Sequence, residues 1–165
     1  MEATSDIAIR SARRADAATI HALTRALAAD MDSFQQVTSK PEDFANYGFG
    51  DTRRFWALLA ERDGHAVGLC VYFRTFSSWR GQPGIYVQDL YVSPDVRGAN
   101  IGQRLLAEAA RRGAADGATH VRLCVDHRNT AAQGFYAAIG LHWRDDERVF
   151  EAVEADFLAL ADSCR

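Results

Sequence analysis

A glycine-containing loop between a β-prone run and a helix carries the clearest chemical signal in the sequence. The run that ends at Val92 leads into Ser93-Pro94, and R-G-A-N-I-G at residues 97–102 then opens directly into a helical pattern. Such a loop turns several backbone N–H groups toward one point, and the helix start adds unsatisfied amides and the positive end of its dipole. The loop therefore predicts a pyrophosphate-binding site, with an ordinary strand–turn–helix corner as the alternative.

The side chain of Arg97 can add a cationic contact to a bound phosphate. A solvated charge on the loop is the plainer interpretation of the same residue. The loop lacks the spacings GxGxxG and GxxxxGK[ST], so neither a Rossmann dinucleotide site nor a P-loop is expected.

Composition and charge exclude several classes of protein. The 165 residues are 48% hydrophobic and 25% charged, as expected for one globular domain over residues 1–165. The formal net charge of −3 leaves no broad basic surface for nucleic acid, and no apolar run is long enough to cross a membrane. The N-terminal residues do not resemble a signal peptide, so we expect a cytoplasmic protein with no membrane or nucleic-acid partner.

The cysteines and histidines point to no metal site. Cys70 and Cys124 lie in apolar runs and make an odd number with Cys164, without a CxxC pair, which favours reduced thiols in the core over disulfides. The five histidines show no ligand spacing such as HExxH, so we expect no metal ion.

The pattern of apolar residues predicts the elements that position the loop. β-Prone or alternating runs predict strands at residues 7–10, 55–61, 66–74, 85–92, 121–125, 141–143 and 148–152. Helical spacing predicts helices after Asp16, from 101 to near Gly113, over 129–139 and around Phe157, whereas residues 30–54 are expected to be irregular. Hairpins come first and helix crossovers later. We therefore predict an α/β fold of the α+β type, with a mixed, mostly antiparallel central sheet flanked by helices in a single domain.

Two motifs together resemble the GNAT superfamily of N-acetyltransferases. V-x-P-x-x-R-G-x-x-I-G, beginning at Val92, looks like the acetyl-CoA loop of that superfamily, and N-x-x-A-x-x-F-Y-x-x-x-G, beginning at Asn129, looks like its second coenzyme motif. The resemblance implies a GNAT-like fold with acetyl-CoA as co-substrate. By motif match, the coenzyme-binding residues are Leu90, Tyr91, Val92, Arg97, Gly98, Ala99, Asn100, Ile101, Gly102, Gln103, Asn129 and Phe135.

Asn100 departs from the family pattern, which usually has glycine there. Asparagine tolerates a positive φ better than other non-glycine residues, so we expect the loop to form with somewhat weaker coenzyme affinity.

A closer resemblance, covering most of the chain, is to the spermidine/spermine (diamine) N-acetyltransferase branch. It is carried by residues 48–50, 73–81, 86–92 and the ending from 148 to the last helix. Membership near that branch implies a small-molecule amine substrate, such as a polyamine, a diamine or an amino-acid-like amine. It also implies a homodimer, with the aromatic residues Trp79 and Tyr86 as weak support.

The resemblance implies acetyl transfer by direct attack of a primary amine in a ternary complex. The attacking nitrogen must be neutral, although a free alkyl amine has a pKa of roughly 10. The departing thiolate benefits from a proton. In the family a tyrosine on the later helix supplies that proton, and by motif match this residue is Tyr136. A partly buried core tyrosine is the alternative.

The general base is open. The diamine branch has a Glu-Asp pair where this chain has Gln88-Asp89, and glutamine cannot accept the proton. Asp89 could act through water, bind the substrate's ammonium group, or hold backbone amides in place. His127, which follows a strand, is either a base or a surface loop residue.

The segment after the first helix carries acids in the diamine branch. Here the acids are Asp30 and Asp32, while Met31 and Gln35 stand where acids are typical. This composition predicts a preference for a monoamine or an amino-acid-like substrate over a long polyamine, with a solvated helix end as the alternative.

Two other functions stay open: a non-catalytic acyl-CoA-binding regulator, and an acetyltransferase for a protein amine. Tyr136, which coenzyme binding alone does not require, favours an enzyme.

Overall fold

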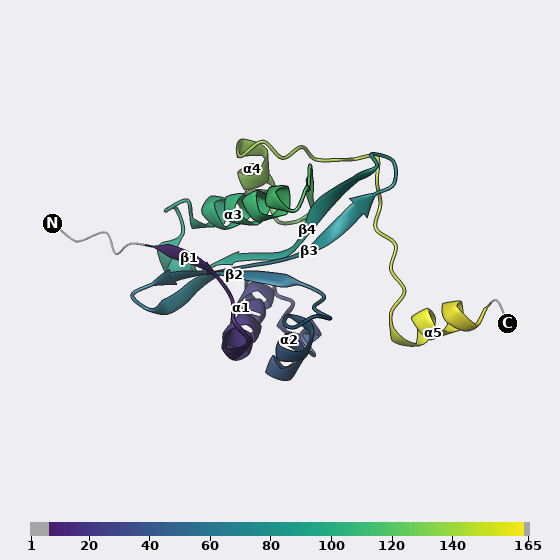
Figure 1. Cartoon of the computed structure of the whole chain (residues 1–165), viewed down its shortest axis with the longest axis horizontal. Coiled ribbons are helices and arrows are strands. Elements are labelled where there is room, and N and C mark those ends of the chain that lie inside the picture. Colours follow the sequence, from purple (N-terminus) through teal and green to yellow (C-terminus); the bar gives the residue numbers. More distant parts are fainter. Residues whose placement is uncertain (1–6, 164–165) are drawn as a thin grey trace. The chain divides into compact units, whose positions relative to one another are not determined.

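The computed structural model describes residues 7–163, and Cys164 lies outside them. The chain forms two compact units, Met1–Cys124 and Val125–Arg165. The elements of the first unit are β1 (Ala8–Ser11), α1 (Ala17–Asp30), α2 (Pro41–Tyr47), β2 (Trp56–Arg62), β3 (His65–Ser77), β4 (Gln82–Val92), α3 (Ile101–Ala115) and β5 (Val121–Leu123). The second unit carries α4 (Thr130–Ala138) and α5 (Glu154–Asp162) (Figure 1).

The sheet has the order β1-β2-β3-β4-β5. The first four strands are antiparallel neighbours, and β5 pairs with β4 in parallel after the crossover through α3. The predicted mixed, mostly antiparallel sheet is thereby confirmed. Whether residues 1–165 act as a single domain stays a prediction.

Helices cover both faces of this sheet: α1 and α2 lie on one side and α3 on the other (Figure 1). On the α1 side, Ile20 and Leu23 join a buried cluster with Leu59 and Val71. On the α3 side, Leu105 is fully buried. These two apolar layers fix the ends of α1 and α3, from which the candidate site is built.

A β-bulge interrupts β4 at Gln88. Val71 of β3 lies opposite Asp89, whereas the next residue, Tyr72, lies opposite Val87, so Gln88 has no partner on β3. The parallel pairing of β4 with β5 is confined to Ile85–Val87. The pairing of β4 with β5 therefore ends before the bulge. Beyond it, β3 is the only described strand that pairs with β4.

The bulge also decides the face on which Asp89 lies. Residues directly opposite in an antiparallel pair point to the same face, so Asp89 shares the face of Val71, which belongs to the α1-side cluster. Val87 shares the face of Tyr72 instead. In a regular strand residues 87 and 89 would share one face.

The structure differs from the predicted elements in three places. Residues 41–47 form α2, where an irregular segment was expected; Pro41 at its first position and the Asp43 carboxylate, which accepts the Lys40 N–H at 2.8 Å, open it. β4 begins at Gln82, before the predicted start at residue 85, and therefore includes Pro83 and Gly84. The strands predicted at 141–143 and 148–152 are wrong: neither segment is a strand, because alternating apolar residues form one only where a neighbouring strand is present to pair with.

Candidate active site

The glycine loop has the backbone shape that the sequence predicts. Gly98 has φ +87° and Asn100 has φ +57°, both in the left-handed region. Asn100 is the N-cap of α3, which begins at Ile101. An asparagine therefore takes the place of the family's glycine at a positive φ, as expected from its tolerance of that region.

The start of α3 offers a set of free backbone donors. The first hydrogen bond at this end runs from the Arg104 N–H to the Asn100 carbonyl at 2.9 Å. Within the described chain, no backbone or side-chain oxygen accepts from the amides of residues 98–103. These donors lie at the positive end of a 15-residue helix, which is the arrangement that binds phosphate groups.

Arg97 is the first residue of this loop, and its side chain contacts three neighbours. Its Nε donates to the Val92 carbonyl at 2.9 Å, and its guanidinium carbon lies 6.0 Å from the centre of the Tyr91 ring. Its Nη2 forms an ion pair with the Asp30 carboxylate at the end of α1. The structure thus joins a predicted coenzyme residue to a predicted substrate residue.

The strand that leads into the loop contributes mainly its backbone. Tyr91 is buried in the α1-side cluster, while Leu90 and Val92 are half-buried. Any contact of Tyr91 with a ligand would therefore use its peptide group. Ala99 and Gln103 are exposed, and Ile101 is buried, so the side chain of Ile101 packs in the protein interior.

Gln88 and Asp89 have different surroundings. The Gln88 side chain is exposed at the bulge, and Asp89 is half-buried. Burial raises the pKa of the Asp89 carboxyl above its ordinary value. No hydrogen bond or ion pair joins that carboxyl to another described residue, so the structure does not support the interpretation that Asp89 holds backbone amides.

Asp32 and the two described cysteines of the first unit differ in their exposure to solvent. Asp32 is exposed and has φ +53° in the turn after α1. Cys70 is a buried free thiol, and burial, together with the charge of Asp89, raises its pKa to about 12. Cys124 is free but exposed, so the expectation of a core thiol is wrong there because β5 ends one residue earlier.

Sequence reasoning missed the role of Tyr86. Its ring stacks on Phe73 at 5.1 Å between centroids, and burial raises the pKa of its hydroxyl to about 12, helped by a hydrogen bond with Cys124. The pairing of Tyr86 with β5 could have been found only from the parallel register of β4 and β5. Tyr86 is thus a half-buried packing residue rather than an exposed aromatic, whereas Trp79 is fully exposed.

In the second unit, Asn129 caps α4. Its Oδ1 accepts the Ala132 N–H at 3.0 Å, so the side chain has a structural task at the helix start. Phe135 and Tyr136 lie on this helix with ring centroids 5.1 Å apart in a tilted, edge-type arrangement, and both are half-buried.

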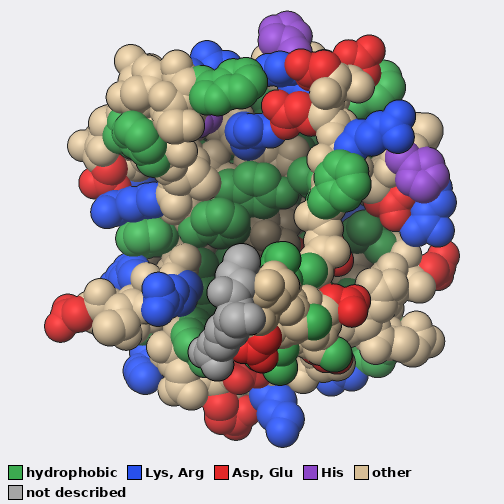
Figure 2. Space-filling model, turned by 90° about the vertical axis from the view of Figure 1, so that its right-hand side faces the viewer, with side chains coloured by type: hydrophobic (Ala, Val, Ile, Leu, Met, Phe, Trp, Pro, Cys, Tyr) green, Lys and Arg blue, Asp and Glu red, His purple; other side chains and the backbone are tan. Residues whose placement is uncertain are grey.

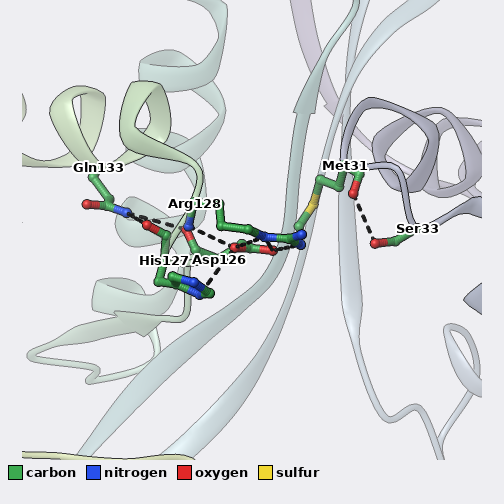
Figure 3. A network of polar contacts seen from close by, with 6 residues as sticks. All are labelled: Met31, Ser33, Asp126, His127, Arg128 and Gln133. Atoms are coloured by element: carbon green, nitrogen blue, oxygen red, sulfur yellow. Dashed lines mark hydrogen bonds and ion pairs between the residues drawn. The ribbon is translucent and has the colours of Figure 1, made fainter.

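His127 lies in the segment before α4 and is 92% exposed. Its neighbour Asp126 bonds Arg128, whose hydrogen bonds hold the pKa of the Asp126 carboxyl well below its usual range. Gln133 donates to the carbonyls of Asp126 and His127 (Figure 3). These contacts order the segment around the backbone of His127, and its exposed ring fits the plainer interpretation of a surface loop residue.

Residues 7–163 hold neither a metal-binding cluster nor a membrane-spanning helix. No group of three or more His, Cys, Asp or Glu side chains there is arranged to hold a metal ion. None of the helices in that range combines the length and the hydropathy needed to cross a membrane.

Comparisons with known proteins point in one direction. The model of the Acetyltransferase (GNAT) family matches residues 20–141. The thialysine N-epsilon-acetyltransferase of Bos taurus is 33% identical over 142 residues, which cover 81% of this chain and 83% of that protein. The spermidine/spermine N(1)-acetyltransferase-like protein 1 of Homo sapiens is 27% identical over 139 residues, or 80% of this chain and 20% of that longer protein.

A solved structure of the aminoglycoside N-acetyltransferase AAC(6')-Iy in complex with CoA shares the fold. It aligns with a TM-score of 0.68 at 19% identity, over 94% of this chain and 99% of that one. At this identity the likeness concerns the fold alone.

Proposed function

This chain belongs to the acetyltransferase (GNAT) family, and from that premise we propose that it transfers the acetyl group of acetyl-CoA to a primary amine of a small molecule. The observation that carries the proposal is the loop at 97–102, whose amides 98–103 have no acceptor within the described chain. A pyrophosphate fits such a donor set, because it brings several anionic oxygens to one helix start.

Bound acetyl-CoA supplies an acetyl thioester that a neutral amine can attack. Three tasks then fall to the residues of this chain. The amides of 98–103 hold the pyrophosphate, the hydroxyl of Tyr136 delivers a proton to the departing sulfur, and a base or water removes one from the amine. Asp89 suits the last task or the binding of the ammonium group, since burial raises its pKa and no partner among the described residues occupies its carboxyl.

The proposed substrate is a compact amine with an amino-acid-like backbone or a single second charge. The named activity of the Bos taurus relative concerns thialysine, an amino acid that carries a side-chain amine. Residues 28–37, at the end of α1 and in the turn after it, carry only two acids, Asp30 and Asp32, and Asp30 is paired with Arg97. So few acids match one or two positive charges better than the several charges of a long polyamine.

The test is release of free coenzyme thiol while a panel of amines is offered. The panel contains thialysine, lysine, a D-amino acid, spermidine, an aminoglycoside and a lysine-containing peptide. We expect the highest kcat/KM with an amino-acid-like amine. Coenzyme binding without thiol release on any amine would indicate a regulator, and release on the peptide alone would indicate a protein substrate.

We also propose a homodimer, because apolar side chains are exposed along the C-terminal part of the chain. The exposed residues are Trp143, Val149, Phe150, Val153, Phe157, Leu158 and Leu160. Figure 2 shows one face of the molecule, with hydrophobic side chains (green) at the surface among charged ones. A second copy could cover such residues, since large exposed apolar surfaces on a soluble protein commonly mark protein–protein contacts.

Light scattering at micromolar concentration should give a dimer mass for the wild type and a monomer mass for Phe150→Asp. Tyr47→Ser, at an exposed aromatic of α2, is the matched control and should leave the mass unchanged. A wild-type monomer would contradict the proposal. A cytoplasmic location is proposed as well, and cell fractionation would test it.

A further inference from the structure

The ion pair between Asp30 and Arg97 joins two parts of the proposed site that lie far apart in the sequence. Asp30 is the last residue of α1, and Arg97 opens the glycine loop. The guanidinium is turned onto the end of β4 by its bond to the Val92 carbonyl. Among the described residues, the side chain of Arg97 contacts Asp30 of α1 and Tyr91 and Val92 of β4, and none of residues 98–103. The positive charge of Arg97 is therefore paired with the carboxylate of Asp30.

This pair is suited to exchange. The two side chains are 52% and 36% exposed, and exposed ion pairs contribute little stability. Only Nη2 of Arg97 contacts the Asp30 carboxylate. A diphosphate carries more negative charge than this carboxylate and offers arginine a two-point contact. The guanidinium would therefore leave Asp30 for a pyrophosphate bound at the neighbouring amides.

The carboxylate of Asp30 lies at a position where a negative charge is unfavourable without a neighbouring cation. It lies at the C-terminus of a 14-residue helix, where the helix dipole favours positive charge and disfavours a carboxylate. Arg97 supplies the positive charge in this structure. Once Arg97 turns to the phosphates, the carboxylate needs another partner, and the ammonium group of an amine substrate has the matching charge.

We propose that acetyl-CoA and the amine bind with positive coupling through this pair: the pyrophosphate takes Arg97, and the released Asp30 binds the ammonium group of the incoming amine. The inference rests on the proposed function and adds to it an energetic coupling between the coenzyme site and the amine site. By linkage, the factor by which coenzyme raises amine affinity equals the factor by which the amine raises coenzyme affinity.

Calorimetry on the full chain tests the coupling. Coenzyme A serves as the unreactive coenzyme probe, and the best substrate of the amine panel serves as the amine probe. For the wild type, saturating coenzyme A should raise amine affinity at least about fivefold, the lower end of typical couplings. Asp30→Asn should abolish that increase. The same variant should bind coenzyme A as well as the wild type or up to about fivefold better, because no exposed ion pair has to be broken.

The variant Arg97→Gln should change the two affinities in opposite directions. It should weaken coenzyme A binding but raise the affinity of the coenzyme-free protein for the amine, since Asp30 is released from the start. Asp116→Asn breaks the Arg74–Asp116 pair, which is similarly exposed and lies at the end of α3. As the matched control, it should leave both affinities and the coupling unchanged.

Three results would overturn the inference while leaving the proposed function intact. The first is a coupling that persists in Asp30→Asn. The second is a loss of coenzyme affinity in that variant, which would make Asp30 a support for Arg97. The third is a wild type that binds coenzyme A and acetylates an amine with no coupling between the two. Failure of the wild type to bind coenzyme A would instead overturn both proposals.

Discussion

Replacement of Gln88 tests the chemistry at the β4 bulge most directly. Gln88 is the unpaired residue of the bulge, its side chain is exposed, and it precedes the half-buried Asp89, whose pKa is raised by burial. The change Gln88→Glu adds a carboxylate with almost no change in size. We expect this variant to acetylate its best amine faster than the wild type at neutral pH, because a base then stands where the diamine branch has one.

The magnitude follows from the supply of neutral amine. An alkyl amine with a pKa of roughly 10 is only about one part in a thousand neutral at pH 7, and this fraction rises about a hundredfold by pH 9. The wild type, without a strong base, should show kcat/KM rising by about tenfold per pH unit over that range. General bases contribute roughly 10²–10⁴-fold, so the gain of Gln88→Glu at pH 7 should be on the order of 100-fold and should shrink toward pH 9.

The change Gln88→Glu should also affect the pKa of the neighbouring Asp89. The added negative charge raises the pKa of Asp89 further, because like charges disfavour ionisation of both groups. The carboxylate form of Asp89 is then lost at a higher pH, so the acidic limb of the variant's profile should move upward. Asp89→Asn in the same background should remove that shift.

The assay is kcat/KM from thiol release between pH 7 and 9 at constant ionic strength, with pre-steady-state data to establish that chemistry limits the rate. Gln88→Asn is the neutral control and should follow the wild-type slope. A flat wild-type profile with an amine of high pKa would refute the reasoning, because another group would then remove the proton. Asp89→Asn and His127→Gln would identify it.

Three further predictions address the tyrosine, the loop and the acid stability of the fold. Tyr136→Phe should lower kcat by roughly 10²–10⁴-fold with little change in the Kd for coenzyme A; full turnover, with chemistry limiting, would remove Tyr136 from the mechanism. Gly102→Glu should weaken coenzyme A binding in calorimetry far more than Gly102→Gln, since the two side chains are of similar size but only the carboxylate repels phosphate; equal affinities would contradict the assigned loop. The hydrogen bond from Arg10 lowers the pKa of Asp16 from its ordinary 3.8, so this stabilisation is complete above that value and is lost as the pH falls below it. Arg10→Gln should therefore lower Tm at pH 7 and flatten its fall in acid, and parallel Tm curves for the two proteins would count against the pairing.

Local rules made much of the fold predictable from the sequence. The Asp63-Gly64 turn takes positive φ at both residues, 52° and 77°, as the hairpin between β2 and β3 requires. Asn100 adopts the left-handed backbone expected of it, and α3 begins directly after it. In each case a few adjacent residues decide the conformation.

Features that depend on distant partners were not predictable in the same way. Asp30 looked like a substrate acid or a solvated helix end, and its partner Arg97 is 67 positions away in the chain. The strands predicted at 141–143 and 148–152 have the right alternation but no neighbouring strand to pair with. The bulge at Gln88 could not be predicted from the neighbouring residues in the sequence, because it is defined by the register between β3 and β4.

That register explains why the chemistry centres on Asp89. In an unbroken strand, residue 89 would lie on the face of Val87, which the pairing with Tyr72 sets. The extra residue at 88 reverses the alternation and places Asp89 on the face of Val71, where α1 packs. Asp30 lies at the end of that same helix. One inserted residue in β4 therefore puts the half-buried carboxyl of Asp89 on the side of the sheet from which Asp30 is proposed to bind the amine, whereas a regular β4 would have turned it toward the side covered by α3.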